Sequence, residues 1–339
     1  MPDTIVKENL RGHMAYSLHH ADCIEWLLDE PEKSFEAIVT DPPYGLKEFS
    51  HKEQSKLRYG NRGGVWRIPP TLGGNTRSPL PRFTVLTQRE LAEIHDFFRR
   101  WGAAALRVAV PGAHLFIATN PFLSPPLYAA LIDAGWEKRG EIVRLVRTLK
   151  GGDRPKNAET EFHDVTVMPR SAWEPWGLFR KALEGRVQDN LRRWRTGGLR
   201  RVSAERPFTD VIASERTPRA ERDIVDHPSL KPQKFMRQIV RASLPLGAGR
   251  VLDPFMGGGS TIAAAEAVGY DSVGVEADAH YYATAASAIP LLAALYPNWS
   301  AKEQRASARP VDIDGADEFI SFPQQLAQDF SFHLISRKD

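Results

Sequence analysis

A short apolar run that ends in a rigid turn constrains this chain more than any other feature. Residues 35–40 are rich in β-branched side chains and too short for a typical helix, which favours a buried parallel strand. Pro42 and Pro43 follow at once and can continue neither a strand ladder nor a helix. We therefore expect Asp41 and Tyr44 at the carboxyl end of a sheet, where open α/β folds bind their ligands.

The tetrapeptide Asp41-Pro42-Pro43-Tyr44 suits chemistry on the amino group of a flat base. The Asp41 carboxylate and a proline carbonyl can each accept one hydrogen from an NH2 group, which favours a nucleophilic nitrogen. Tyr44 offers an aromatic face on which the base can stack. The alternative is an ordinary Asp-Pro turn with a surface tyrosine.

A second motif has the layout of a strand, a glycine loop and a helix. Residues 250–253 are strand-like, Gly257–Gly259 permit close backbone approach, and residues 262–267 favour a helix. Ser260 or Thr261 is predicted to cap that helix, whose first N–H groups favour an anionic group. The pattern predicts a nucleotide-type binding loop.

An acidic strand end completes this unit. Residues 272–275 form another short strand that ends in Glu276, about 20 positions past the glycines, where a ribose hydroxyl is usually held. A nicotinamide enzyme is the main alternative, but a clean G-x-G-x-x-G is missing, and Asp253 to Phe255 stand where its glycines would begin. Asp253 as a turn carboxylate and Phe255 as a core residue remain alternatives.

Both motifs resemble those of the S-adenosylmethionine-dependent DNA amino-methyltransferases, which methylate adenine N6 or cytosine N4. The family's DPPY stands at 41–44 and its DPF-x-G-x-G-[ST] at 253–260. Residues 227–232 are similar to the family's HPTQKP, with leucine in place of glutamine, and residues 20–27 to its GD-x-x-x-x-L, with histidine in place of glycine. The catalytic element precedes the cofactor element, as in the circularly permuted β group.

The resemblance implies a role for each matching residue. Asp41, Pro42, Pro43 and Tyr44 would hold the target amine and the base. Glu276 would bind the ribose hydroxyls of S-adenosylmethionine, and Asp22 its adenine amino group unless it is only a helix cap. The full set expected to bind the cofactor is Asp22, Ser229, Lys231, Asp253, Pro254, Phe255, Gly257, Gly259, Ser260, Thr261 and Glu276.

Composition narrows the class of protein. The single cysteine, Cys23, excludes a disulfide framework and a multi-cysteine metal site, and no metal is expected. No signal peptide or long apolar stretch is present among the 339 residues. We therefore expect no membrane partner and a cytoplasmic protein of a bacterium or phage that acts at the nucleoid.

Basic charge is concentrated in two segments although the net charge is only +3. Residues 45–85 carry eight Lys and Arg against two Asp and Glu, and residues 144–222 carry eighteen against eleven. Such segments suit the phosphate backbone of double-stranded DNA, although a solvated loop or an ordinary insertion that packs its tryptophans would look similar. The predicted DNA-binding residues are Lys47, Arg58, Arg62, Lys150, Arg154, Lys156, Arg192, Arg193 and Arg195.

The elements between the motifs alternate. A helix is predicted over 88–108, a turn at Pro111-Gly112, a strand at 114–118, a short helix at 125–134 and a strand at 141–149. The predicted fold is α/β, a doubly wound, mostly parallel Rossmann-like methyltransferase sheet with an inserted target-recognition module. Its expected parts are a catalytic half at 1–149, a recognition region at 150–226, a cofactor half at 227–300 and a C-terminal extension at 301–339.

The predicted activity is methyl transfer to adenine N6 of a base flipped out of double-stranded DNA, because family members with Asp at the first position of the tetrapeptide mostly act on adenine. Alternatives are cytosine N4, RNA or a protein glutamine amide, and a DNA-binding protein without catalysis. A homodimer and a cognate restriction endonuclease are partners that the resemblance leaves open.

Overall fold

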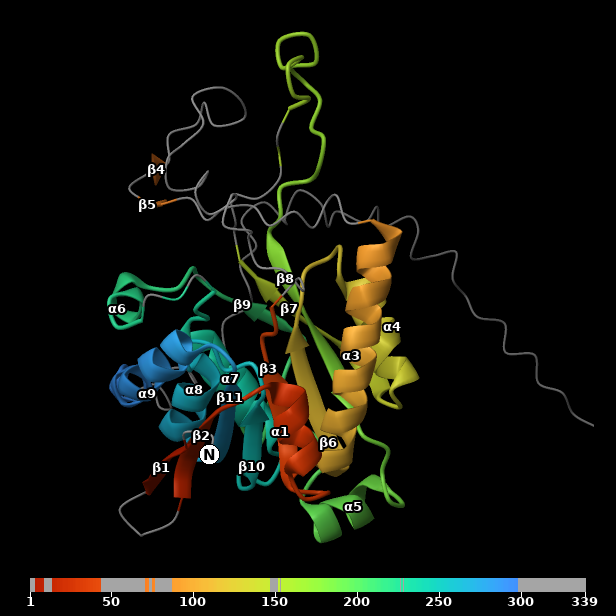
Figure 1. The fold of residues 1–339 in the computed structure, drawn as a ribbon, viewed down its shortest axis with the longest axis vertical. Helices are drawn as coiled ribbons and strands as arrows, with labels where there is room; N and C mark the ends of the chain where they lie inside the picture. The colour runs from red at the N-terminus through yellow and green to blue at the C-terminus, as the bar shows by residue number, and fades with distance from the viewer. Residues whose placement is uncertain are drawn as a thin grey trace, which may run out of the picture. The chain divides into compact units, whose positions relative to one another are not determined.

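The computed structural model describes residues 4–8, 14–43, 71–72, 75–76, 87–146, 152, 154–225, 227 and 229–297. Its main sheet has nine strands in the order β1-β2-β11-β10-β3-β6-β8-β7-β9 (Figure 1). The strands are β1 Thr4–Glu8, β2 Met14–His20, β3 Phe35–Thr40, β6 Ala109–Ala118, β7 Glu137–Leu145, β8 Trp173–Arg180, β9 Val211–Ala213, β10 Arg250–Asp253 and β11 Asp271–Glu276. A separate pair joins β4 Thr71–Leu72 to β5 Asn75–Thr76.

The centre of the sheet is parallel, which confirms the predicted α/β class. The neighbours β2, β11, β10, β3 and β6 all run in one direction, and Ile38 of β3 lies opposite Leu252 of β10. The two motifs, far apart in the sequence, therefore stand on adjacent strands. Strand β8 runs antiparallel between β6 and β7, and β1 runs antiparallel to β2 at one edge.

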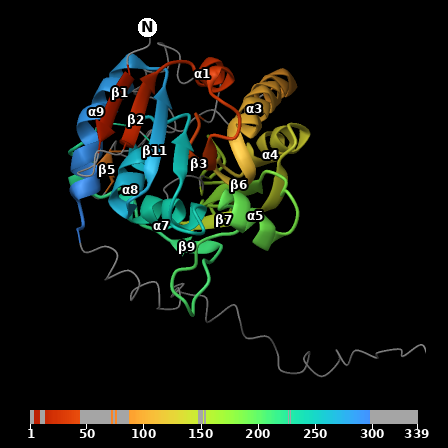
Figure 2. The same ribbon diagram turned by 90° about the horizontal axis from the view of Figure 1, so that it is seen from below.

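Helices cover both faces of this sheet (Figures 1 and 2). Apolar side chains of α1, α3 and α4 pack on one face, whereas those of α7, α8 and α9 pack on the other. Ile38 contributes to the first core and Val39 to the second, as the alternation of a strand requires. The described helices are α1 Cys23–Asp29, α3 Gln88–Val108, α4 Ser124–Asp133, α5 Val187–Trp194, α6 Arg219–Arg222, α7 Gln233–Ser243, α8 Ser260–Val268 and α9 Ala279–Ala294.

The predicted helix over 88–108 is confirmed with both ends in place. Thr87 accepts from the Glu90 N–H while the Glu90 side chain accepts from the Thr87 N–H, a reciprocal cap that fixes the first turn. Trp101 on its apolar face is fully buried, so its truncation to alanine would cost about 3–5 kcal/mol. The predicted helix at 125–134 is α4, displaced by one residue.

The predicted turn at Pro111-Gly112 lies inside β6. Phe35 pairs with Ala109 but Ala37 pairs with His114, so the extra residues form a bulge in which Gly112 adopts a φ of 78°. The strand expected at 141–149 begins earlier, at Glu137, and ends at Leu145. Both differences arise because strand ends are set by pairing with distant partners.

The predicted recognition region does not stand apart from the sheet. Strand β8 lies within it and fills the gap between β6 and β7, and β9 adds the edge strand. Trp176, which belongs to the second basic segment, is fully buried in the core, as the alternative of an insertion that packs its tryptophans expects. Apart from β4 and β5, residues 45–85 lie outside the described residues, as does the extension at 301–339. No helix of the described ranges is long and apolar enough to cross a membrane.

Candidate active site

Two aspartates meet where adjacent parallel strands end. Asp41 directly follows β3, and Asp253 is the last residue of β10. The Thr40 hydroxyl donates a hydrogen bond of 2.7 Å to the Asp253 carboxylate and ties the strand ends together. The Asp41 side chain is 16% exposed, whereas Asp253 is buried. The carboxyl end of the sheet thus presents one accessible and one buried acid.

Burial governs the charge of Asp253. Loss of solvent raises the pKa of its carboxyl to about 7, against the opposing hydrogen bonds from Thr261 and Thr40, and the negative Asp41 nearby adds to the rise. The Phe255 N–H also donates to this carboxylate, at 3.1 Å. Asp253 therefore acts as the anchor of the loop that leaves β10.

Lys231 joins the segment at 227–232 to the turn that begins at Asp41. Its ammonium group forms an ion pair with the Asp41 carboxylate and lies 3.7 Å from Glu174 Oε2. The Lys231 side chain is only 8% exposed, and its backbone N–H donates to the Ser260 hydroxyl at 3.3 Å. The segment is therefore held both to Asp41 and to the start of α8.

The glycines of the loop at 257–259 are required both by the backbone conformation and by the lack of space for side chains. Gly257 and Gly259 have φ values of 49° and 84°, which favour glycine. A Cβ on Gly258 would lie 2.7 Å from the Val225 side chain. The backbone here approaches its surroundings more closely than any side chain would allow, as a loop that holds a ligand by its N–H groups requires.

The predicted cap of α8 is wrong in detail. Gly259 is the residue before the helix, and its lack of a side chain leaves that position without a side-chain cap. Ser260 and Thr261 are the first helical residues. The Ser260 hydroxyl accepts from Lys231, and the Thr261 side chain bonds to Asp253, so both hydroxyls join the surrounding segments to the loop.

Glu276 fastens the glycine loop from the next strand. Its two carboxylate oxygens accept from the Gly257 and Asp278 N–H groups, each at 2.9 Å. Burial raises the pKa of Glu276, and these two hydrogen bonds oppose the rise. The residue expected to hold a ribose thus lies in direct contact with the loop expected to hold the rest of the cofactor.

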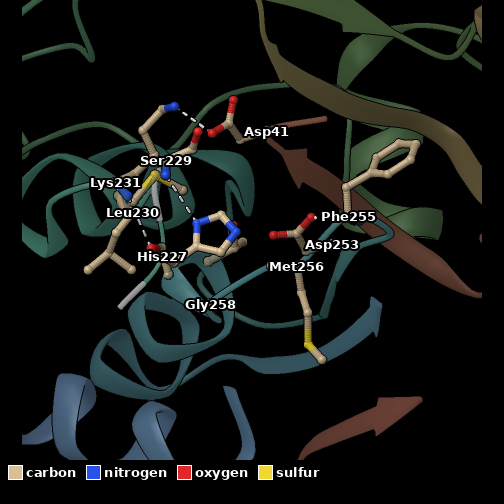
Figure 3. Close-up of a pocket in the computed structure, with 13 residues that line it drawn as sticks. Asp41, His227, Ser229, Leu230, Lys231, Asp253, Phe255, Met256 and Gly258 are labelled. Atoms are coloured by element: carbon tan, nitrogen blue, oxygen red, sulfur yellow. Dashed lines mark hydrogen bonds and ion pairs between the residues drawn. The ribbon is translucent and has the colours of Figure 1, made fainter. Parts of the chain in front are cut away.

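A pocket opens between these parts (Figure 3). Figure 3 shows the side chains of Asp41, His227 and Asp253 around the same space. The predicted site residues that line the pocket are Asp41, Ser229, Lys231, Asp253, Phe255, Gly257, Ser260 and Thr261. The lining residues without a predicted role are His227, Leu230, Met236, Met256 and Gly258. The signal for His227 and Leu230 was present, since both belong to the 227–232 motif.

Other predicted residues lie beside the pocket. Pro42 is buried and Pro43 exposed in the turn after β3. Pro254 and Gly259 belong to the loop but do not line the pocket. Phe255 lines it and also packs on Trp101, with ring centroids 5.5 Å apart, so the core role suggested as an alternative holds as well.

Asp22 caps a helix, as its alternative interpretation predicts. Its side chain accepts from the Ile24 and Glu25 N–H groups, at 2.8 and 3.1 Å, at the start of α1. It follows β2, and β2 pairs in parallel with β11, so Asp22 lies at the same end of the sheet as Glu276. Contact with a cofactor stays a prediction.

The predicted DNA-binding residues separate into three groups. The first group, Lys47, Arg58, Arg62 and Lys150, lies outside the described residues, as does Tyr44, which follows Pro43. Arg154 and Lys156 are exposed in the segment that leaves the carboxyl end of β7, which Figure 1 shows projecting at the top. Since β7 runs parallel to β9 and in the direction of β6, this segment leaves from the same end of the sheet as Asp41.

The third group lies elsewhere. Arg192, Arg193 and Arg195 are on or next to α5, which packs at the amino end of the parallel strands (Figure 1). Asn190 of this helix donates to the Pro111 carbonyl at the start of β6, at 2.9 Å. The structure therefore does not bring these arginines to the candidate site, because the antiparallel β8 carries the chain back across the sheet.

Many arginines of the second basic segment serve the fold. Arg192 pairs with Asp189 at 3.2 Å and Arg193 with Glu184 at 3.0 Å. Arg180 pairs with Glu137 at 2.7 Å between β8 and β7. Arg180 is only 11% exposed, whereas the side chains of Arg192 and Arg193 stay 75% and 69% exposed, so the charge count along the sequence does not separate buried from solvent-facing arginines.

The chemistry of the pocket fits S-adenosylmethionine. Gly257 to Gly259 leave room that a Cβ would fill, and the N–H groups at the start of α8 suit an anionic group. The carboxylates of Asp41 and Asp253, which both line the pocket, complement a sulfonium cation. Glu276 does not line the pocket but accepts from Gly257, which does, and its carboxylate offers acceptors for hydroxyls. A ligand between the loop and the catalytic turn would touch both.

Comparison with known proteins identifies the relatives. The family described as DNA methylase, of the N6/N4 type, matches residues 35–287. The Type II methyltransferase M2.DpnII of Streptococcus pneumoniae is 22% identical over 266 residues, which span 78% of this chain and 85% of that protein.

The structure of a DNA methyltransferase shares the fold. PvuII DNA methyltransferase, which is cytosine-N4-specific, aligns with a TM-score of 0.52 and 15% identity over 86% of this chain and 93% of that one. A protein designated a DNA modification methylase from Thermus thermophilus, complexed with S-adenosyl-L-methionine, aligns with a TM-score of 0.49 and 18% identity over 82% and 95%. The family match covers most of the sheet and both motifs. The chain belongs to the N6/N4 family of DNA methylases, the S-adenosylmethionine-dependent DNA amino-methyltransferases.

Proposed function

We propose that this protein methylates adenine N6 in double-stranded DNA. The observation that carries the proposal is the position of Asp41, which follows β3 and lines the same pocket as the glycine loop. An amine that donates a hydrogen to Asp41 would lie next to the space that suits the cofactor. The target base must leave the helical stack, because its amino group cannot reach this pocket inside a duplex.

The chain's own residues orient the amine and the cofactor. S-adenosylmethionine supplies an electrophilic methyl group when bound. Asp41 and the backbone of Pro42 accept the amine hydrogens and direct the nitrogen lone pair toward the pocket, and Tyr44 stacks on the base. Glu276 binds the ribose, Asp22 the adenine amino group, and Ser229 and Lys231 lie near the methionine part. The amine would gain an N–C bond as the S–CH3 bond of the sulfonium breaks and leaves a neutral thioether, and the amine would release one proton to solvent.

Adenine is favoured over cytosine by Asp41, since relatives with aspartate at this position mostly act on adenine. The same acceptors would suit the N4 amine of cytosine, which is therefore the alternative outcome. RNA and protein amides are disfavoured because the matched family acts on DNA. Single-molecule sequencing of DNA from cells that express the chain would report the modified base and its sequence context.

DNA would approach the carboxyl end of the sheet. Arg154 and Lys156 are proposed to contact phosphates there, together with Lys47, Arg58, Arg62 and Lys150. A second copy of the chain and a cognate restriction endonuclease remain proposed partners.

The test is transfer of a tritiated methyl group to unmethylated genomic DNA by the parent protein and by Asp41→Ala. We expect the substitution to lower the rate by at least about 100-fold, since one oriented acceptor is lost from the transition state. Nucleoside mass spectrometry of the product then reports the base. Undiminished transfer by Asp41→Ala would refute the assigned role, and N4-methylcytosine alone would replace adenine by cytosine.

A further inference from the structure

Four charged side chains form a row behind the catalytic turn. Lys231 bridges Asp41 and Glu174, and Arg144 donates to Glu174 Oε2 at 3.2 Å. Arg144 of β7 and Glu174 of β8 are cross-strand partners in the sheet. The row alternates in sign from the accessible Asp41 to the buried Arg144, so its charges balance.

Glu174 is fixed while Lys231 reaches it on a flexible stem. The Trp176 indole donates to Glu174 Oε1 at 2.7 Å, and Arg144 is itself held by the Ser214 hydroxyl and the Glu215 carbonyl, at 3.0 and 3.1 Å. Burial would raise the pKa of Glu174, but the Lys231 and Arg144 cations outweigh it and lower that pKa. The lowered pKa favours the anionic form of Glu174, which lies 3.7 Å from the ammonium group of Lys231.

The ion pair between Lys231 and Asp41 opposes the role of Asp41 in catalysis. An ammonium group in contact with the carboxylate draws electron density from the oxygens that must accept the amine hydrogen. It also occupies Oδ2, one of the two acceptor oxygens. A target amine would therefore meet a weakened acceptor unless the ammonium group can move.

We propose that Glu174 is a positioning residue that receives the Lys231 ammonium group when the target amine binds Asp41. The inference rests on the proposed function. In the absence of DNA, Lys231 shields Asp41 from the nearby Asp253 carboxyl. When the amine arrives, the ammonium group shifts by about 1 Å, from 3.7 Å to the contact distance of a charged hydrogen bond with Glu174, and Asp41 becomes a stronger acceptor. No proton moves and no net charge changes.

Glu174→Gln tests the charge at this position. The amide keeps the size of the side chain but offers Lys231 no anion, so the ammonium group stays on Asp41. We expect the single-turnover rate of methyl transfer to unmethylated genomic DNA to fall roughly tenfold, with KM for the cofactor unchanged. Glu174→Asp retains the charge and is expected to recover part of the rate.

Glu137→Gln is the matched control. Glu137 and Arg180 form the other cross-strand ion pair of β7 and β8, at 2.7 Å, at the end of these strands away from Asp41. This substitution removes the same kind of pair from the same ladder, and because Glu137 is 40% exposed against 20% for Glu174, its effect on urea unfolding should be no larger. Its transfer rate should equal that of the parent.

The outcomes separate the inference from the proposed function. A parent protein that transfers no methyl group to DNA would refute the function itself. With an active parent, the Glu174 role is overturned by an unchanged rate in Glu174→Gln, or by equal losses in Glu174→Gln and Glu174→Asp. It is also overturned if Glu174→Gln alone unfolds or loses cofactor binding in calorimetry, since the residue would then be structural.

Discussion

At the scale of single residues, the carboxyl group of Asp253 is buried in the protein interior. Its carboxyl group accepts from Thr40, Thr261 and the Phe255 N–H, and these bonds offset part of the cost of burying a charge. Burial still prevails and raises its pKa to about 7. The carboxyl group that anchors the glycine loop therefore changes charge near neutral pH, which gives a measurable signature.

The folded protein holds one more proton on Asp253 than the unfolded chain does between the ordinary pKa of 3.8 and about 7. The contribution of this residue to the free energy of unfolding is therefore present at low pH and is lost as the pH rises through this window. Asp253→Asn cannot ionise. At about pH 8 we expect it to exceed the parent in free energy of unfolding by roughly 2–4 kcal/mol, and near pH 4 the gap should close. Urea unfolding of both proteins between about pH 4 and pH 8 measures this difference in free energy. A difference that does not depend on pH would contradict the raised pKa of Asp253.

At the scale of an element, helix α8 has a glycine at each of its ends. Gly259 before the helix and Gly269 after it have φ values of 84° and 78°. A Cβ on Gly259 would lie 2.6 Å from the Ile289 side chain, whereas one on Gly269 would meet nothing within 4 Å. Both positions thus require a positive φ, but only Gly259 lacks space for a side chain.

Alanine at each position separates these two demands. Gly269→Ala should cost about 1 kcal/mol through backbone strain alone and leave cofactor affinity intact. Gly259→Ala should cost roughly 2–4 kcal/mol, because overpacking against Ile289 adds to the strain, and it should weaken cofactor binding by displacing the loop. Urea unfolding and calorimetry with S-adenosylmethionine measure both effects. Equal losses at the two positions would show that the contact with Ile289 is unimportant.

Elements with a local signal were predictable, and elements set by distant pairing were not. Helix α3 has its own cap and apolar face, and β3 is a short, mostly apolar run that ends at two prolines, so both were found at the right residues. Strand β8 was missed, since it lies in a segment rich in arginine and its place between β6 and β7 depends on partners about 30 to 60 residues away. Glu174 was missed with it, because nothing near it in sequence marks an acid that faces Lys231.

The placement of charge on the whole molecule follows from the reversal of the chain at β8. The segment that contains Arg154 and Lys156 leaves from the carboxyl end of the sheet, but β8 then runs back, so α5 lies at the opposite end (Figure 1). A duplex that delivers a base to Asp41 would face Arg154 and Lys156 and not the arginines of α5. The two predicted basic groups therefore differ in what they can contact.

A salt titration distinguishes the two ends. Each phosphate contact contributes about 0.9 to the slope of the logarithm of DNA affinity against the logarithm of salt concentration. Replacing Arg154 and Lys156 together by alanine should therefore reduce that slope by about 2. The matched pair Arg192→Ala and Arg193→Ala removes the same charge from α5 and should leave the slope unchanged, because these side chains pair with Asp189 and Glu184 at the far end of the sheet. Fluorescence anisotropy with a labelled duplex gives both slopes. A smaller slope for the α5 pair alone would place DNA at the amino end of the strands and separate DNA binding from the pocket at Asp41.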